Sequence, residues 1–129
     1  MKRYLFLLIM FCITLTLAED LSVRTTAFTM KAKINSKWSD WLTPEPSNLL
    51  INIDVNSRVI TIYSQEIQYY GVRECLITEL NLGEYSLTMF KVVNTSNEVG
   101  DFIVLNKRDG TSNFLFIFDN LIILYNVIL

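Results

Sequence analysis

Short apolar and polar runs alternate along most of the chain beyond its apolar N-terminus. Residues 85–93 alternate most regularly, with Leu87 and Met89 on one side and Phe90 on the other. A two-residue period is that of a β-strand, and no long stretch keeps the 3.6-residue period of a helix. The pattern therefore predicts an all-β domain.

Turn-forming residues divide these runs. The clearest predicted hairpin joins residues 49–54 to residues 58–64 through Asn56, a residue that tolerates a positive φ. Asp109-Gly110 marks a second hairpin. Residues 65–80 are ambiguous, because they fit either two strands with a bulge or turn at Gly71 or a strand followed by a short helix over residues 73–80. The other predicted strands span residues 22–33, 38–42, 85–93, 102–106, 114–118 and 121–129.

The spacing of the predicted strands indicates how they connect. Eight or nine strands recur about every 10–14 residues with mostly short connections, and tight connections join antiparallel neighbours. We therefore expect an antiparallel meander of about eight strands, closed into a small barrel or half-barrel of lipocalin-like type. A β-sandwich is the alternative. We see no second domain in residues 19–129.

The N-terminus has the features of an export signal. Lys2 and Arg3 precede an uncharged, largely apolar run of 14 residues, 4–17, and the small residue Ala18 follows. A membrane-spanning helix needs about 20 apolar residues, so this run is short for an anchor. The sequence predicts a helical signal peptide at residues 1–18, cleaved after Ala18. The mature chain, residues 19–129, would be periplasmic or secreted, without a stable transmembrane span; an uncleaved anchor is the alternative.

Composition disfavours several functions. Cleavage would remove two of the 11 basic residues and none of the 13 acidic ones, which leaves a net charge of −4 and no basic stripe for nucleic acid. The chain has no histidine, the commonest general base and metal ligand. We therefore expect no enzyme activity, metal or cofactor. Cys75, the one cysteine left after cleavage, is expected to be unpaired and buried.

Two aromatic pairs are candidate binding residues. Trp38 and Trp41 lie three positions apart, so a regular strand would send one indole into the core and leave the other outside. Tyr69 and Tyr70 are adjacent, so one of the two rings should also lie outside. Exposed Trp and Tyr side chains suit protein partners and sugars, whereas core packing is the alternative for all four residues.

The C-terminal pair of strands is apolar on both alternating faces. A strand with one solvated face should alternate, so residues 114–118 and 121–125 need cover on both sides. One alternative is burial under a loop or the N-terminal strand, and another is an interface with a partner or a second copy. A transmembrane barrel would need such apolar strands throughout. The candidate interface residues are Phe114, Phe116, Ile122 and Leu124.

Several short motifs resemble those of a known group of proteins. The chain carries W-S-x-W within residues 37–41, an N-x-L-I strand at residues 48–53 and I-x-I-Y-S within residues 58–64, followed by Tyr69 and a closing Tyr-Asn-Val at residues 125–127. This pattern resembles small exported proteins of unknown function from Bacteroidota and their crAss-like phages. The resemblance implies a host and a β-rich fold, and it implies no activity.

Two function classes follow from these observations. The first is an exported, non-enzymatic module that binds a protein partner, or itself, through exposed aromatic side chains or the C-terminal apolar face. The second is a carrier that holds a small apolar ligand inside a lipocalin-like barrel, which rests on the expected fold alone. The side chains expected to line such a cavity are Tyr63, Phe90, Phe102 and Phe116. An enzyme that relies on carboxylates alone is a third, weaker alternative.

Overall fold

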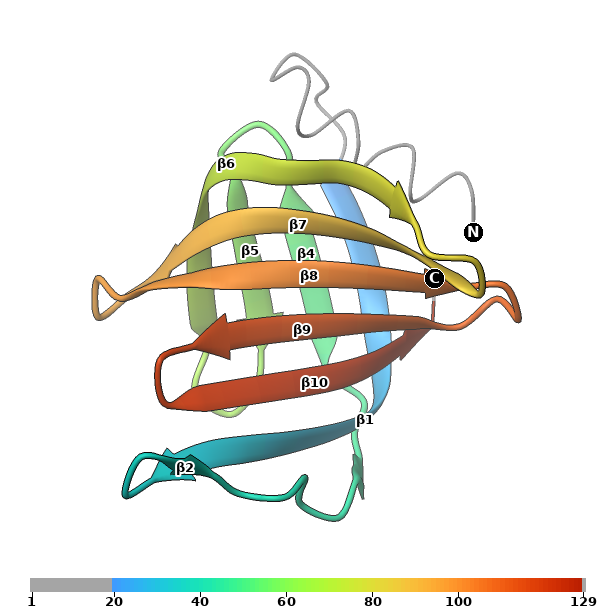
Figure 1. The fold of residues 1–129 in the computed structure, drawn as a ribbon. Helices are drawn as coiled ribbons and strands as arrows, with labels where there is room; N and C mark the ends of the chain where they lie inside the picture. Colours follow the sequence, from blue (N-terminus) through green and yellow to red (C-terminus); the bar gives the residue numbers. More distant parts are fainter. Residues whose placement is uncertain (1–19, 129) are drawn as a thin grey trace.

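The computed structural model describes residues 20–128, which form ten β-strands (Figure 1). The predicted signal peptide, residues 1–18, lies outside the described residues and stays a prediction. The strands are β1 (Asp20–Ile34), β2 (Lys37–Trp38), β3 (Glu45–Pro46), β4 (Leu50–Asp54), β5 (Val59–Tyr63), β6 (Gln68–Asn81), β7 (Tyr85–Asn94), β8 (Val99–Lys107), β9 (Ser112–Phe118) and β10 (Leu121–Ile128).

Eight of these strands close into an antiparallel barrel. The strand order is β10-β9-β8-β7-β6-β5-β4-β1, and β10 also pairs with β1 to complete the ring. From β4 to β10, each strand lies beside the next one in the sequence, so the expected all-β antiparallel meander is confirmed, as a barrel. The two-residue strands β2 and β3 pair with β1 outside this ring.

The long strands β1 and β6 each pass from one side of the barrel to the other. β1 pairs with β4 through residues 20–24 and with β10 through residues 24–32, and its register shifts between Thr25 and Ala27. β6 pairs with β5 near its start and with β7 over residues 70–81, with several register shifts. Such bulges bend a strand and reverse which alternate positions face inward. In Figure 1, β7–β10 consequently cross in front of β4 and β5.

Two predicted elements differ from the structure. Residues 38–42 do not form a strand, because β2 ends at Trp38 and residues 39–44 follow β1 without strand geometry. Residues 65–80 contain no helix and no turn at Gly71; β6 runs as a single strand from Gln68 to Asn81. The bulges interrupt its two-residue period, which explains why the sequence pattern there was ambiguous.

Turn chemistry explains the short connections. Gly110 has a φ of 93° in the turn between β8 and β9, as Asp109-Gly110 predicted. In the β4–β5 turn, the Asp54 carboxylate accepts the backbone N–H groups of Asn56 (3.0 Å) and Ser57 (3.1 Å). The positive φ of that turn, 59°, falls at Arg58 rather than at the predicted Asn56. The hydrogen bond to Asp54 thus holds Asn56 inside the turn, and the residue with left-handed backbone geometry is Arg58, at the end of the turn.

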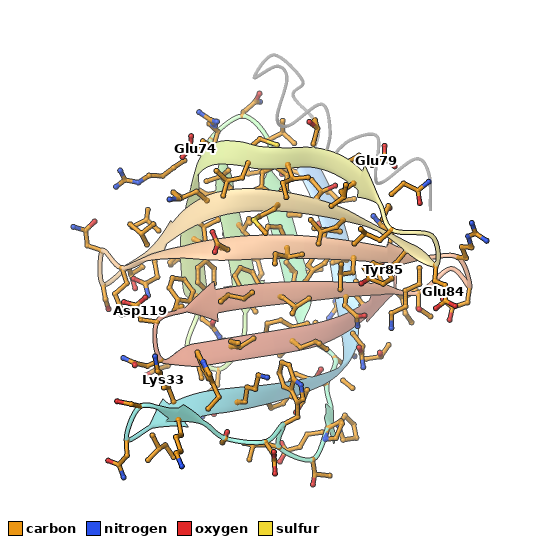
Figure 2. All side chains as sticks on the ribbon, viewed as in Figure 1. Lys33, Glu74, Glu79, Glu84, Tyr85 and Asp119 are labelled. Carbon is orange, nitrogen blue, oxygen red and sulfur yellow. The ribbon has the colours of Figure 1, made fainter. Side chains whose placement is uncertain are left out.

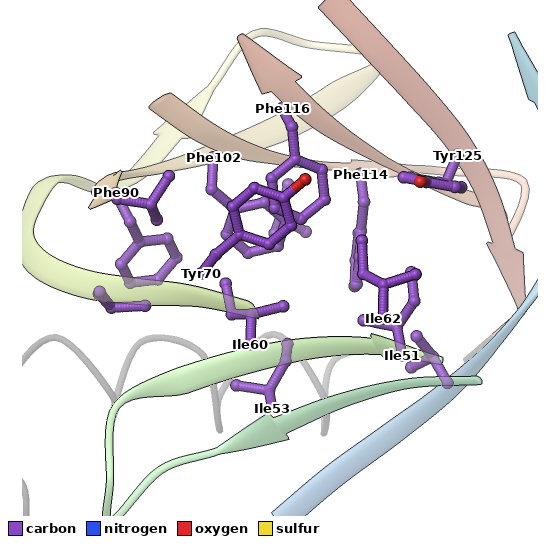
Figure 3. Close-up of a cluster of buried hydrophobic side chains, with 14 of the residues drawn as sticks. Ile51, Ile53, Ile60, Ile62, Tyr70, Phe90, Phe102, Phe114, Phe116 and Tyr125 are labelled. Carbon is purple, nitrogen blue, oxygen red and sulfur yellow. The ribbon is translucent and has the colours of Figure 1, made fainter. Parts of the chain in front are cut away.

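The hydrophobic core lies inside the barrel. Alternate residues of the strands point inward, and the interior includes four fully buried phenylalanines, two on β9 and one each on β7 and β8. Isoleucines of β4 and β5 face them from the other side of the barrel (Figure 3). The most buried large side chains are Phe90, Phe102, Phe114, Phe116, Ile51, Ile53, Ile60 and Ile62.

Cys75 of β6 packs, partly buried, against this core. It is disulfide-bonded in the structure, so the expected unpaired thiol is wrong for the 129-residue chain. The other cysteine of the sequence, Cys12, lies outside the described residues.

Candidate functional site

The two candidate tryptophans both lie on the surface. Trp38 is 40% exposed and Trp41 is 42% exposed, so the expectation that one indole enters the core is wrong. That expectation assumed a continuous strand, which the chain does not form here. The Lys33 ammonium lies 5.9 Å from the ring centroid of Trp38, and the Lys31 ammonium lies 4.7 Å from that of Trp41. Each indole therefore has one face against a cation of β1.

Residues 37–47, which we call the edge segment, hold these indoles in place. The backbone N–H groups of Ser39 (2.8 Å), Leu42 (2.9 Å) and Ser47 (3.0 Å) donate to carbonyl groups along β1. The hydroxyl of Thr29 also donates to the Leu42 carbonyl. The edge segment thus pairs with β1 beyond the point where β4 ends. An unpaired strand edge would otherwise be open to other chains.

The tyrosine pair divides between the two faces of β6, as expected. Tyr69 is 48% exposed on the outside of the barrel. Tyr70 is buried, with its ring centroid 4.4 Å from that of Phe116 and its hydroxyl donating to the Gln68 side-chain oxygen at 2.7 Å. Tyr70 is therefore a core residue rather than a surface binding residue. Tyr63 is exposed as well, so it does not line the interior.

Burial changes the acidity of Tyr70 and makes stability depend on pH. Desolvation, reinforced by nearby Tyr125, raises the pKa of Tyr70 from 10.0 to about 12. The folded state favours the neutral phenol of Tyr70. The stability that this preference contributes is fully present below pH 10 and is lost as the pH rises toward 12. The loss expected over this range is about 2–3 kcal/mol.

The Tyr70→Phe variant should remove that pH dependence, apart from the share due to Tyr125, whose pKa is also raised by burial. The measurement is urea unfolding at a series of pH values from about 9 to about 12. Tyr69→Phe changes the exposed neighbour and serves as the control, since it should keep the wild-type slope. If the unfolding free energy of Tyr70→Phe fell with pH as steeply as that of the wild type, the raised pKa could not be assigned to Tyr70.

The predicted C-terminal interface residues belong to two different faces. Phe114 and Phe116 are fully buried inside the barrel, so they are not interface residues and this part of the prediction is wrong. Ile122 and Leu124 are half-buried on the outside. The pairing of β9 with β10 explains this division. The inward Phe116 lies opposite Ile123. Leu115 lies opposite Leu124, and Ile117 lies opposite Ile122. The outward partners of Ile122 and Leu124 are therefore Ile117 and Leu115.

Apolar side chains continue outward across several neighbouring strands. Met89 on β7, Ile103 on β8, Leu115 on β9 and Leu124 on β10 are direct neighbours in register. We call the whole set the outer apolar face, and it faces the reader over β6–β10 in Figure 2. Its residues are Ile77, Leu80, Leu87, Met89, Ile103, Leu105, Leu115, Ile117, Ile122 and Leu124.

The sequence analysis identified only Ile122 and Leu124 of this face. The apolar side of residues 85–93, with Leu87 and Met89, was visible as an alternation. Whether this apolar side lies near Leu115 depends on the register of β8, the strand between β7 and β9. A two-residue period in the sequence does not determine that register. The face therefore becomes visible only when the strands are in place.

The outer surface over β1, β4 and β5 carries several polar side chains. On β1 and β4 the outward residues include Ser22 and Asn52, whose amide donates to the Ser22 hydroxyl at 3.0 Å. Arg24 and Asp54 lie on the same surface, one pair of positions to either side. The outward residues of β4 and β5 also include Leu50, Val59 and the exposed Tyr63, so this side is mixed, whereas the outer apolar face lies over β6–β10.

Phenylalanine side chains from neighbouring strands contact one another inside the barrel. The Phe102 ring lies 4.8 Å from that of Phe116 and 5.2 Å from that of Phe114, measured between centroids. Phe90 lies 5.9 Å from Phe102 on its other side (Figure 3). An eight-stranded barrel is just wide enough for side chains to fill or for one small ligand to bind. A separate, open depression is lined by the polar residues Ser64, Gln65, Glu66 and Gln68.

The two carboxyl groups with lowered pKa values accept hydrogen bonds within turns. A hydrogen bond from the Ser57 backbone is the main cause of the lowered pKa of Asp54, and one from the Thr111 hydroxyl is the main cause for Asp109. A general acid needs a raised pKa instead. Among residues 20–128, no three Asp, Glu, Cys or His side chains gather where they could hold a metal ion.

Comparison with known proteins finds no matching family model, curated protein or solved structure. The resemblance to exported proteins of Bacteroidota and their phages therefore stays a prediction. None of the described residues forms a helix that is long and apolar enough to cross a membrane.

Proposed function

We propose that this chain is an exported, non-enzymatic interaction module that binds a protein partner through its outer apolar face. The observation that carries the proposal is the row of Met89, Ile103, Leu115 and Leu124 across four strands, in which Ile103 is buried and the other three side chains are half-buried. Monomeric proteins rarely expose apolar patches larger than a few hundred Å² without a function for them. A sheet face that is apolar on the outside, while the other outer side is mixed, suits docking.

The packed interior supports this function over that of a carrier. Phe90, Phe102 and Phe116 were expected to line a ligand cavity; they are buried inside the barrel, and the Phe102 ring stacks with those of Phe90 and Phe116. A ligand in that place would have to displace side chains that are fully buried. Binding on the exterior needs no such rearrangement.

The surrounding residues fit the usual composition of a protein interface. Such an interface has an apolar centre, a polar rim and enrichment in Trp and Tyr. Trp41 with Lys31 borders the face on the β1 side, and the exposed Tyr85 lies at one end of β7 (Figure 2). Of the four aromatic residues proposed from the sequence, Trp38 and Trp41 remain candidate binding residues at this border.

Site-specific photo-crosslinking tests this function. A photoreactive amino acid would be placed at position 115, in cells of the source organism, and a matched control at position 52. Leu115 and Asn52 are both half-buried and point outward, but they lie on the apolar and the mixed side of the barrel. We expect a discrete protein adduct at position 115 and none at position 52. Absence of an adduct at position 115, or equal adducts at both positions, would contradict the proposal.

A further inference from the structure

We infer that the hairpin formed by β1 and β2, together with the start of the edge segment, binds a phospholipid surface. The inference goes beyond the proposed function, because none of the residues that carry it belongs to the outer apolar face. We call these residues the Trp–Lys surface. They are Lys31, Lys33, Ile34, Trp38, Trp41 and Leu42.

Large apolar side chains are exposed to solvent along the Trp–Lys surface. Ile34 is 64% exposed and Leu42 is 56% exposed, and Trp38 and Trp41 are exposed between them in the sequence. Tryptophan is enriched where a lipid bilayer meets water, because its ring is apolar and its N–H is polar. Transfer of these four side chains from water to the lipid boundary would therefore favour binding.

The charge of this stretch differs in sign from that of the chain. Residues 31–42 contain three lysines and one carboxylate, that of Asp40, whereas the whole chain has a net charge of −2. Glu45, farther along the edge segment, and Asp119, in the turn before β10, limit the local positive charge (Figure 2). The apolar side chains must therefore provide most of the binding, and the lysines add contacts with lipid phosphate groups.

Both sides of the hairpin have the same chemistry. Lys33 lies opposite Trp38, and Ile34 lies opposite Lys37. Neighbouring positions on a strand face opposite sides, so each side of the hairpin carries one lysine and one large apolar side chain. A protein partner would cover one side of the hairpin, whereas a lipid surface surrounds both sides of a tip that enters it. Lysine is also depleted in protein–protein interfaces.

The hairpin is ordered before it meets a ligand, and its tip extends past the barrel. The turn residues Asn35 and Ser36 both have a positive φ, 51° and 65°, as in the type I′ turns of tight hairpins. The pairing of β1 with β10 ends at Ala32, and the Lys33 N–H donates to the Asn120 carbonyl at 2.9 Å. Residues 34–37 continue beyond this point (Figure 1). Binding therefore has little ordering of the backbone to offset.

Tryptophan fluorescence in the presence of lipid vesicles tests this inference, because both tryptophans of the chain lie on the Trp–Lys surface. The protein, purified without detergent, should bind vesicles of phosphatidylglycerol. Its emission maximum should then move to shorter wavelength, and lipids brominated on their acyl chains should quench the emission. Vesicles of phosphatidylcholine should bind more weakly, and added salt should weaken the binding to phosphatidylglycerol.

Substitutions assign the binding to this surface. Trp38→Ala should weaken vesicle binding about tenfold, with Trp41 left as the fluorescent reporter. Lys33→Gln should weaken binding to phosphatidylglycerol about fivefold, because it removes one cation near an anionic surface. Tyr69→Ala and Lys107→Gln change an exposed aromatic residue and an exposed lysine elsewhere on the barrel, and both controls should bind as the wild type does.

Two results would overturn the inference. The first is an emission spectrum that phosphatidylglycerol vesicles leave unchanged. The second is vesicle binding that stays as strong in Trp38→Ala and Lys33→Gln as in the wild type, which would place the lipid contact on another part of the chain. Neither result bears on the adduct expected at position 115, so the proposed function is tested separately.

Discussion

Replacing Phe116 with alanine is expected to lower the free energy of unfolding by about 3–5 kcal/mol, as large-to-small substitutions of buried aromatic residues do. Phe116 is fully buried and lies within 4.8 Å of the rings of both Tyr70 and Phe102, measured between centroids. Its removal would leave a cavity at the centre of the barrel. A protein of this size has a stability of about 5–15 kcal/mol, so much of it would be lost.

Leu115→Ala is the matched control for this experiment, because Leu115 is the preceding residue and faces outward. Its half-buried side chain should contribute about 1 kcal/mol or less to stability. Urea unfolding of both variants provides the comparison. Equal losses, or a larger loss for Leu115→Ala, would mean that β9 presents the opposite face to the core and would remove the outer apolar face from the account.

Gly100→Ala should be the second very damaging substitution, with an expected loss of about 3 kcal/mol. A Cβ at this position would lie 2.5 Å from the backbone oxygen of Ile117 and 2.6 Å from the ring of Phe118. The oxygen belongs to the neighbouring strand, so relief of the contact requires β8 and β9 to separate. The glycine is needed here because the Phe118 ring lies directly over its backbone.

Gly71→Ala provides the contrast. A Cβ there would meet only a Val93 methyl group at 3.4 Å, which is an ordinary contact. This substitution should change stability by less than about 1 kcal/mol, since alanine also restricts the unfolded chain. Thermal unfolding of the two variants measures the difference. A Gly100→Ala variant as stable as Gly71→Ala would show that β8 and β9 are not in contact as described.

The sequence predicted the parts of the fold that depend on local chemistry. Asp109-Gly110 placed a hairpin correctly because few residues other than glycine adopt its positive φ. The alternation of residues 85–93 gave both faces of β7 correctly. Short turns between successive strands then favoured the meander. The closure of the barrel by β10 on β1 joins residues about a hundred positions apart, and no local pattern indicates it.

The candidate site could be predicted only in part, for two physical reasons. Residues 114–118 and 121–125 are apolar on both faces, so alternation could not tell inward Phe116 from outward Leu115. The tryptophans were assigned by strand geometry, whereas the edge segment that carries Trp41 is held by backbone hydrogen bonds to β1 without being a strand. Both errors concern which way a side chain points, which depends on non-local pairing.

The proposed function requires that the barrel holds no ligand inside and binds on its outside, and native mass spectrometry of the protein, purified without detergent, tests this most directly. The expected masses are those of the polypeptide alone, with no small-molecule adduct. A monomer that carries a stoichiometric small molecule would contradict this, because such a ligand would have to occupy the space in which Phe90, Phe102 and Phe116 stack.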